Sequence, residues 1–427
     1  MKLSSDEQAM LDGEDGSGRQ KAMELLVRYG EALGAEKFVD TDNVTGTMGS
    51  SSTFIRDYFD TGDDRDKLFS YFDLDSDEAV EIPKARTFAC HLQTRFEPQR
   101  PDLHDTPAGA LEFHQDNQEY TAGLGVKMLN TCTPYVVGNT PAQGEHCAWM
   151  ESSAVVYCNS VLGARTNTEG RESTSAAMLT GKIPDWGFHR DEYRFGSHHV
   201  KVETPIESVM DWGMMGYYVG KMVQENIPVI EGISAAPELI HHKHFGAAAA
   251  SSGGVEMYHV VGHTPEADSL EQALGSRKSA ENFVYGINEM REAYDELNAQ
   301  GNSDDIDYVM LGCPHYTLEQ IAVVCRLIEG KKVHENSNLW IFTSRAVRNE
   351  AIKHDFHKII AKAGAVLMTD TCSAMASATP AGTKVAATDS AKQTYYLPSM
   401  LGVEAWFGST KDCVDAALTS KWRGVCP

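Results

Sequence analysis

The chain has 427 residues, and 37 Lys and Arg residues against 61 Asp and Glu residues give it a formal charge of −24. Hydrophobic residues make up 42% of the sequence, which excludes a wholly disordered protein and indicates two or three packed units. Because so negative a surface repels a phosphate backbone, we expect no nucleic-acid partner. No apolar run is long enough to cross a membrane, and residues 1–7 lack the pattern of a secretory signal, so we expect a cytoplasmic protein.

The first hundred residues predict helices interrupted by a polar segment. Ser5 and Gln8 form a capping-box pattern for a short helix, and residues 19–34 have helical apolar spacing. Residues 45–52 are small and polar, and they indicate either a surface loop or a backbone cradle for a ligand. The acid-rich residues 60–77 are interpreted as a solvated insertion.

The last third of the chain predicts alternating strands and helices. Residues 306–311, 339–343 and 365–369 are apolar runs typical of buried strands. Helices are expected from Thr317 to about residue 328 and from Ser344 to about residue 362, with these two residues as N-caps. Such alternation predicts a parallel sheet with right-handed crossovers, so the fold class is α/β.

Three of the nine cysteines follow predicted strands. Cys313 and Cys372 come two or three residues after a strand, and Cys132 follows a further strand expected at residues 126–129. Ligands bind beyond the carboxyl ends of parallel strands, so the three thiols are candidates for one metal centre. The alternative is that they fill the core, as most free cysteines do.

Residues 144–154 and 159–167 mix hydrogen-bonding side chains with small residues, which favours a pocket lining. Glu151, Ser152 and Asn159 would be costly to bury unpaired, and Arg165 has the geometry to bind a substrate carboxylate. The histidine-rich residues 241–244 are interpreted as a solvated surface. His259 and His263 are treated as structural residues in a strand-like segment.

Several blocks together resemble the aconitase X family, and in particular its large subunit. They are residues 132–135, 144–153, 159–167, 259–266, 312–315, 370–372 and 390–396. The resemblance implies an aconitase-like α/β architecture with several subdomains and parallel sheets around a central iron–sulfur site. We expect an N-terminal region (1–105) with a substrate loop, a central region (106–300) with Cys132 and the polar segment, and a C-terminal domain (301–427). Residues 106–123 and 246–254 are the expected joints.

The resemblance also implies an active site. Cys132, Cys313 and Cys372 match the ligands of an iron–sulfur cluster, of the [4Fe-4S] or the [2Fe-2S] type. Further residues match catalytic or substrate-contacting positions: Glu151, Ser152 and Lys392, and the loop residues Gly46, Thr47 and Met48. Ser153 and Asn159 are expected to join them from the polar segment, whereas Arg165 is inferred from its chemistry alone. The family base is a serine on a swivelling domain, so a small-subunit partner is expected.

Members of this family dehydrate small hydroxy acids, either cis-3-hydroxy-L-proline or 5-phosphomevalonate. The Ser-Gly-Val-Ser and Asn-Pro patterns of the phosphomevalonate enzymes are replaced here by residues 45–48, Thr-Gly-Thr-Met, and 88–91, Phe-Ala-Cys-His. The leading hypothesis is therefore a hydro-lyase that converts cis-3-hydroxy-L-proline to Δ1-pyrroline-2-carboxylate. The alternatives are 5-phosphomevalonate dehydration, an iron-sensing RNA-binding protein, and a structural subunit with a buried cysteine core.

Overall fold

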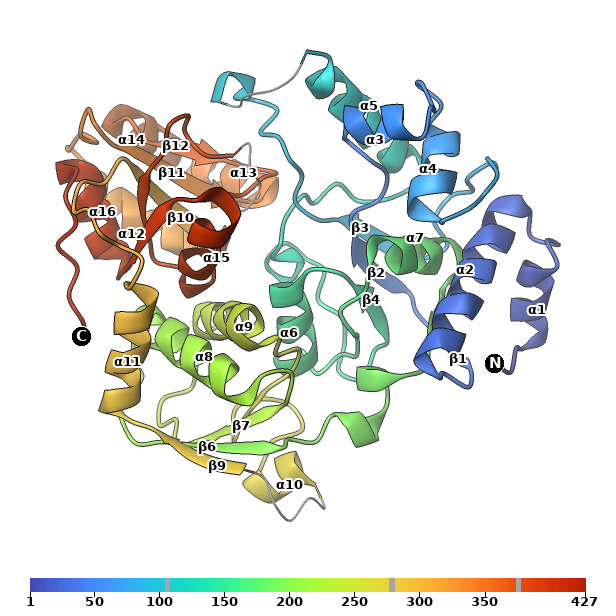
Figure 1. Ribbon diagram of the computed structural model, residues 1–427, viewed down its shortest axis with the longest axis horizontal. Coiled ribbons are helices and arrows are strands. Elements are labelled where there is room, and N and C mark those ends of the chain that lie inside the picture. Colours follow the sequence, from blue (N-terminus) through green and yellow to red (C-terminus); the bar gives the residue numbers. More distant parts are fainter. Residues whose placement is uncertain (104–107, 276–280, 374–377) are drawn as a thin grey trace.

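The computed structural model describes residues 1–103, 108–275, 281–373 and 378–427. In this part of the chain, three parallel sheets and one two-stranded antiparallel sheet are surrounded by helices. Figure 1 shows three regions in chain order, one blue to green, one green to yellow and one orange to red. The mixed α/β class with several parallel sheets, predicted from the sequence, is confirmed.

The N-terminal region is built on the parallel sheet β3-β2-β4. This sheet joins residues from both sides of residue 105, where a boundary was expected. The antiparallel pair β1-β5 lies beside it. The elements are α1 (Ser5–Leu11), α2 (Ser17–Leu33), β1 (Phe38–Asp40), β2 (Asn43–Gly46), α3 (Thr53–Tyr58), α4 (Arg65–Asp73), β3 (Phe88–His91), η1 (Pro101–Leu103), α5 (Ala110–Gly123), η2 (Pro134–Val136), β4 (Cys147–Trp149), α6 (Ser152–Ser160), α7 (Arg171–Thr180), β5 (Lys182–Pro184), η3 (Gly187–His189) and η4 (Asp191–Tyr193).

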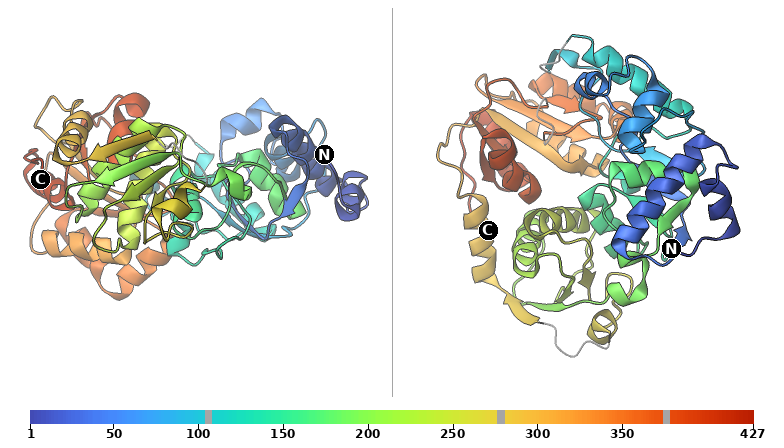
Figure 2. Two further views of the ribbon diagram at one scale, coloured as in Figure 1. Left: turned by 90° about the horizontal axis from the view of Figure 1, so that it is seen from below. Right: turned by 45° about the vertical axis from the view of Figure 1, so that its right-hand side comes forward.

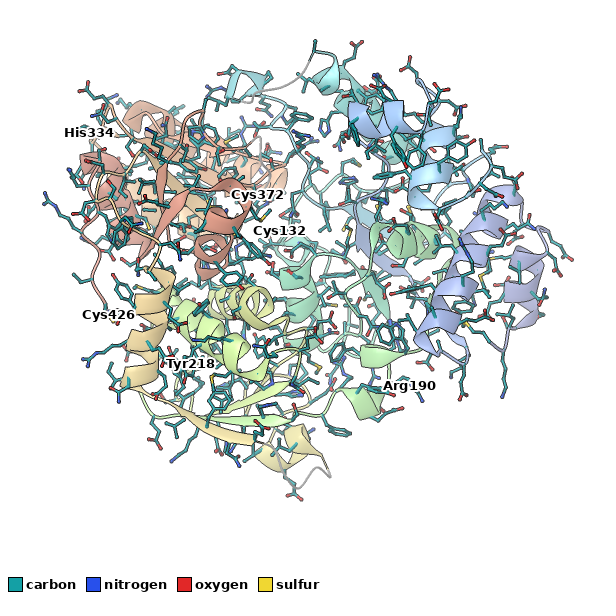
Figure 3. All side chains as sticks on the ribbon, in the orientation of Figure 1. Cys132, Arg190, Tyr218, His334, Cys372 and Cys426 are labelled. Carbon is teal, nitrogen blue, oxygen red and sulfur yellow. The ribbon has the colours of Figure 1, made fainter. Side chains whose placement is uncertain are left out.

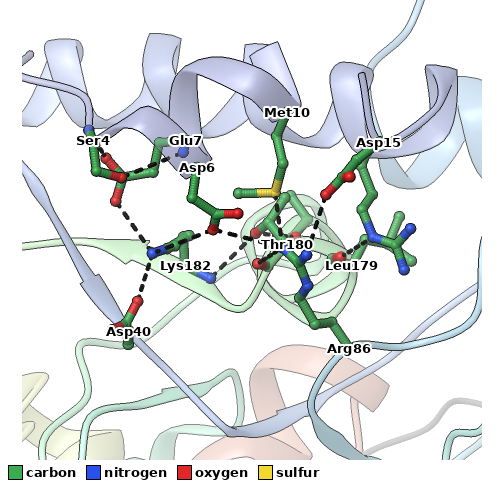
Figure 4. Close-up of polar contacts among 12 residues, drawn as sticks. Ser4, Asp6, Glu7, Met10, Asp15, Asp40, Arg86, Leu179, Thr180 and Lys182 are labelled. Carbon is green, nitrogen blue, oxygen red and sulfur yellow. Dashed lines mark hydrogen bonds and ion pairs between the residues drawn. The ribbon is translucent and has the colours of Figure 1, made fainter. Parts of the chain in front are cut away.

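Helix α1 is capped by Ser4 and not by Ser5. The Ser4 hydroxyl accepts from the Glu7 N–H at 3.3 Å, and the Glu7 carboxylate accepts from the Ser4 N–H at 2.7 Å. Lys182 of β5 lies 3.4 Å from Glu7 and 2.6 Å from Asp40, as Figure 4 shows. Ion pairs therefore connect α1 to the antiparallel strands β1 and β5.

Three further expectations for this region are wrong. Residues 60–77 are not only a solvated insertion, because α4 buries Leu68, Phe69 and Asp73. Residues 126–129 do not form a strand; Lys127 makes only a single parallel bridge to Cys90. The described part of 106–123 is largely helix α5, whose buried side combines Phe113 with polar residues such as His114 and Asn117 and therefore lacks a clear apolar pattern in the sequence.

The middle region is the parallel sheet β8-β7-β6-β9, with α8 and α9 packed together above it (Figure 1). Residues 246–254 are not a joint, because most of them continue α9. Its small residues allow close packing: a Cβ at Gly253 would lie 1.9 Å from the Gly220 carbonyl oxygen of α8. The elements are β6 (His198–Val202), α8 (Val209–Val223), β7 (Pro228–Glu231), α9 (Leu239–Gly253), β8 (His259–Val260), α10 (Leu270–Leu274), β9 (Glu281–Tyr285) and α11 (Ile287–Leu297).

The C-terminal region is a five-stranded parallel sheet in the order β12-β11-β10-β13-β14. Both predicted N-caps are confirmed, because Thr317 and Ser344 accept from the N–H three residues on. The second predicted helix is divided in two at residues 354–355. The elements are β10 (Tyr308–Tyr316), α12 (Leu318–Ile328), β11 (Asn338–Thr343), α13 (Arg345–Lys353), α14 (Phe356–Ala363), β12 (Val366–Met368), β13 (Val385–Thr388), α15 (Ala391–Leu401), β14 (Glu404–Phe407) and α16 (Thr410–Thr419).

This sheet is buried on both faces, which explains the continuous apolar runs of its strands. Val309 and Leu311 of β10 belong to one hydrophobic cluster, whereas Tyr308 and Met310 belong to another on the opposite face. The strand order reverses between β10 and β13, so the carboxyl ends of these two strands open a crevice of the kind that binds ligands in such sheets. Figure 2 shows the sheet facing the N-terminal region across the middle of the molecule.

Candidate active site

A cavity of about 820 Å³ lies at the start of α15, which follows the carboxyl end of β13. It lies between the loops after β2 and β3, the start of α6, and α15 of the C-terminal region. The lining combines hydroxyls, cations and one carboxylate with aromatic and aliphatic side chains: Thr47, Gly49, Ser50, Ser51, Ser52, Ile55, Phe72, His91, Leu92, Gln93, Thr94, Arg95, Met150, Glu151, Ser152, Arg171, Lys392, Tyr396 and Met400.

Glu151 and Lys392 form an ion pair in this cavity. Lys392 Nζ lies 2.7 Å from Glu151 Oε1, and each side chain is only 11% exposed. Glu151 is the N-cap of α6, so its Oε2 accepts from the Ala154 N–H at 2.8 Å and from the Ser153 hydroxyl at 2.6 Å. Lys392 lies in the first turn of α15, which begins three residues after β13, and it also donates to the Ser152 hydroxyl at 3.3 Å.

The pair keeps both groups charged. Burial acts to raise the pKa of Glu151, but the charge and hydrogen bond of Lys392 outweigh it and the pKa lies below its usual value. Burial acts to lower the pKa of Lys392, but the Glu151 and Cys313 charges raise it above the usual value. A carboxylate with a lowered pKa is a weak base, and an amine with a raised pKa is already protonated at neutral pH, so neither accepts a proton readily. They can bind and orient a substrate, but neither is suited to be the base.

Three buried thiols lie next to this pair. The exposed fractions of Cys132, Cys313 and Cys372 are 6%, 7% and 7%. Burial, together with the charges of Glu151 and the other two thiols, raises the pKa of Cys132. Figure 3 shows Cys132 and Cys372 near each other between the C-terminal region and α6. The charges of Cys313 and Cys372 therefore act on Cys132, and the convergence of the three thiols on one metal centre stays a prediction.

The segment carrying Cys313 is an irregular part of β10. The parallel pairing with β11 is regular up to Leu311 and resumes at Tyr316, so the strand is longer than residues 306–311 but interrupted around the cysteine. Gly312 has a φ of +105°, and a Cβ there would lie 2.2 Å from the Phe342 carbonyl oxygen of β11. Only glycine allows this close approach.

The donor set fits an iron–sulfur cluster. Within residues 1–103, 108–275, 281–373 and 378–427, no three His, Cys, Asp or Glu side chains form a site for a single metal ion. A cluster, however, contains several iron atoms, and the cysteine thiolates bind to more than one of them. The sulfur atoms of the ligands therefore do not converge on one point. Three buried thiols, of which Cys132 lies within the electrostatic reach of the other two and accepts an N–H from His315, match that requirement.

The structure brings some of the other predicted residues into the cavity and leaves others outside. Thr47 lines it. Gly46 ends β2, where a Cβ would lie 2.4 Å from Thr174 Oγ1, and the Met48 side chain is completely buried in the N-terminal core. Asn159 is also buried, and its amide bonds the Thr166 backbone. The contacts seen for Gly46, Met48 and Asn159 are therefore structural.

Arg165 is not in this cavity. It pairs with Asp191 and lines a separate cavity of about 320 Å³ together with Arg194 and His259. The expectation that Arg165 clamps a carboxylate beside Glu151 is therefore not supported by its position. Two arginines, Arg95 and Arg171, line the main cavity, and sequence reasoning missed both. Arg171 was missed because nothing in its local pattern differs from an ordinary helix start.

The histidine-rich residues 241–244 are not a solvated surface. They lie on α9, which packs against α6, α8 and α15, and His242, Lys243 and His244 are at most 5% exposed. Lys243 Nζ donates to the His315 carbonyl at 2.9 Å, so this helix contacts the Cys313 segment directly. His259 accords with its expected structural role: Nε2 bonds the Arg194 carbonyl at 2.8 Å.

No helix in the described part of the chain is long and apolar enough to span a membrane. Family models match nearly the whole chain: the aconitase X first domain at residues 1–192, the second domain at 196–295 and the third domain at 306–419.

Named relatives agree with these matches. The phosphomevalonate dehydratase large subunit of Methanothermobacter thermautotrophicus is 35% identical over 94% of this chain and 95% of that protein. The cis-3-hydroxy-L-proline dehydratase of Pseudomonas aeruginosa is 32% identical over 98% of this chain and 70% of that protein. The holo-form crystal structure of Thermococcus kodakaraensis aconitase X matches with a TM-score of 0.80 at 28% identity, covering 98% of this chain and 100% of the other. The chain therefore belongs to the aconitase X family and is a dehydratase, that is, a hydro-lyase.

Proposed function

We propose that the chain dehydrates cis-3-hydroxy-L-proline to Δ1-pyrroline-2-carboxylate, with an iron–sulfur cluster on Cys132, Cys313 and Cys372 and with a small-subunit partner. The charge balance of the cavity carries this choice of substrate. Lys392 is paired with Glu151, and Arg171 is paired with Glu172, so carboxylates offset the charges of both of these lining cations. A zwitterionic amino acid has no net charge and suits such a lining, whereas phosphomevalonate carries about three negative charges.

The residues of the chain bind and orient this substrate. In this proposal the Lys392 ammonium and the Ser152 hydroxyl hold the carboxylate, and the ionised Glu151 accepts from the ring ammonium. The contacts of Lys392 with Glu151 and Ser152, which bring these three groups together, support these roles. When bound, the cluster supplies a Lewis acid that makes the C3 hydroxyl a better leaving group. Loss of the Cα proton and of hydroxide from C3 gives an enamine, which tautomerises to the product.

The small subunit is proposed to supply the base and to cover the cavity. Glu151 and Lys392 are poor proton acceptors for the reason given above, and relatives of this chain are named as large subunits. Exposed apolar side chains lie on two helices that contribute to the cavity lining through Ile55 and Met400. Phe54 and Tyr58 of α3 are 71% and 73% exposed, and Met400 of α15 is 54% exposed. Exposed aromatic and apolar side chains of this kind are typical of interaction surfaces.

The test is turnover by the chain purified anaerobically with its small subunit. We expect consumption of cis-3-hydroxy-L-proline, with bound iron and visible absorbance, and no consumption of 5-phosphomevalonate. Turnover of the phosphate ester alone would overturn the substrate and the charge-balance argument. Full activity of the isolated chain would overturn the need for a partner.

A further inference from the structure

His315 connects the three cysteine segments. It is fully buried and stands two residues after Cys313. Its backbone N–H donates to Cys132 Sγ at 3.4 Å, and its ring Nδ1 lies 2.9 Å from the hydroxyl of Thr131, the residue before Cys132. Ring Nε2 lies 2.9 Å from the carbonyl oxygen of Thr371, the residue before Cys372. One side chain thus links segments that are far apart in the sequence.

The partners of the ring fix its tautomer. A carbonyl oxygen can only accept, so Nε2 carries the proton and donates to Thr371. Nδ1 is then the acceptor, and the Thr131 hydroxyl donates to it. The Thr131 oxygen in turn accepts from the Thr133 N–H at 3.1 Å. Both ring nitrogens are therefore used, each toward a different cysteine segment.

Lys243 holds the same segment from the opposite side. This lysine of α9 is 1% exposed, and Nζ donates to three acceptors: the His315 carbonyl at 2.9 Å, the Pro314 carbonyl at 3.4 Å and Gln320 Oε1 at 2.5 Å. All three partners are neutral. The acidic groups whose charges act on it most are Cys132, Asp389 and Cys313. Since a buried cation is costly without a negative counterpart, thiolates at Cys132 and Cys313 would supply one.

We propose that His315 and Lys243 form a buried positioning pair: His315 sets the relative places of Cys132, Cys313 and Cys372, and Lys243 fixes the His315 segment and offsets the thiolate charge. The inference rests on the proposed function, because the three cysteines are taken to hold a cluster. Neither residue lines the substrate cavity, so both act through the cysteines.

The first experiment separates the two ring bonds of His315. The full-length chain is reconstituted anaerobically with ferrous iron and sulfide, and iron content and the rate of iron loss to a chelator are measured. An Asn amide reaches the position of Nδ1 and a Gln amide that of Nε2, so H315N and H315Q each keep one bond, whereas H315A keeps neither. We expect 10- to 100-fold weaker iron retention for H315A, and smaller losses for the two amide variants.

The matched control is H259A, which removes a buried imidazole that also bonds a backbone carbonyl but lies in the second cavity. It should retain iron as the wild type does. Wild-type retention in a folded H315A variant would overturn the proposal. If H315A does not fold, the amide variants decide, because equal retention by wild type, H315N and H315Q would overturn it as well. A wild-type chain that takes up no cluster would instead overturn the proposed cofactor.

The second experiment measures the reduction potential of the loaded cluster. Removing a nearby positive charge destabilises the more negative, reduced state, so K243M should shift the midpoint potential to a more negative value. K243R keeps the charge and should stay near the wild type. A merely structural role would lower the loaded fraction without moving the potential, so an unchanged potential in K243M would overturn the electrostatic part of the proposal.

Discussion

Lys392 and Glu151 are 241 residues apart in the sequence, yet Lys392 Nζ lies 2.7 Å from Glu151 Oε1 inside the main cavity. The pair joins the start of α6 to the first turn of α15, two helices that are far apart in the sequence. It therefore contributes both to the chemistry of the cavity and to the contact between the N-terminal and C-terminal regions.

Breaking this pair should destabilise the fold. K392M leaves Glu151 buried without its cation, and we expect a loss of about 3–5 kcal/mol in the free energy of unfolding. The double variant K392M/E151L removes both charges and should recover part of that loss. Urea unfolding measures the free energy of unfolding of both variants. The control is K411M, which removes an exposed pair with Asp415 and should cost less than about 1 kcal/mol. Additive losses in the double variant would contradict this account.

The cysteines should divide into ligands and core residues. C132A, C313A and C372A should each abolish bound iron and dehydratase activity, because each removes a proposed thiolate ligand. C325A should keep both, since Cys325 lies in α12 with its thiol directed at the Phe356 carbonyl. Iron analysis and visible absorbance of the four purified variants check this. Equal losses in all four would favour a buried cysteine core without a metal role.

Asp73 should make stability depend on pH. Burial raises its pKa to about 7, although Arg171 and the Gly49 N–H act in the opposite direction. The folded state therefore holds a proton that the unfolded chain loses near pH 4, so the Asp73 contribution to stability falls as pH rises from about 4 to 7. The total fall is on the order of 4 kcal/mol.

The measurement is the free energy of unfolding of wild type and D73N between pH 4 and pH 8. The amide cannot ionise, so the free energy of unfolding of D73N should rise relative to that of the wild type as pH rises. Most of that relative rise should occur below pH 7. D40N is the control, because the Asp40 carboxylate is exposed. A wild-type-to-D73N difference that does not change with pH would refute the expectation.

The exposed aromatic side chains of α3 should bind the small subunit. Replacing Phe54 and Tyr58 together by serine removes two exposed aromatic side chains of α3, and we expect at least a tenfold loss of affinity, since aromatic residues dominate interface energies. Calorimetric titration with the small subunit measures it. V425S changes an equally exposed apolar residue near the C-terminus and should bind as the wild type does. Unchanged affinity in the double variant would place the partner elsewhere.

Much of the C-terminal sheet could be predicted because its signals are local. Apolar runs indicated β10, β11 and β12, and the capping residues Thr317 and Ser344 indicated the helix starts. The site residues Cys313 and Cys372 followed from this, because chain direction alone places them near one edge of the sheet. Glu151, Ser152 and Lys392 came from resemblance, and the structure groups them in one cavity.

The errors concern interactions between distant segments. Lys243 and its neighbouring histidines have the sequence pattern of a polar surface, but the partners of Lys243 are the backbone of residues 314 and 315 and the side chain of Gln320, more than 70 residues away. Arg165 was expected in the main cavity, yet its partner Asp191 draws it into another. Neither hydrophobic periodicity nor local motif spacing contains these pairings.

The order of the cysteines along the chain has a consequence for biosynthesis. Cys132 belongs to the part that matches the first family domain, whereas Cys313 and Cys372 belong to the third. The thiols that His315 links therefore exist together only after residue 372 has left the ribosome. The proposed cluster could then be completed only late in synthesis, and a chain truncated before residue 372 would lack one of its three proposed ligands.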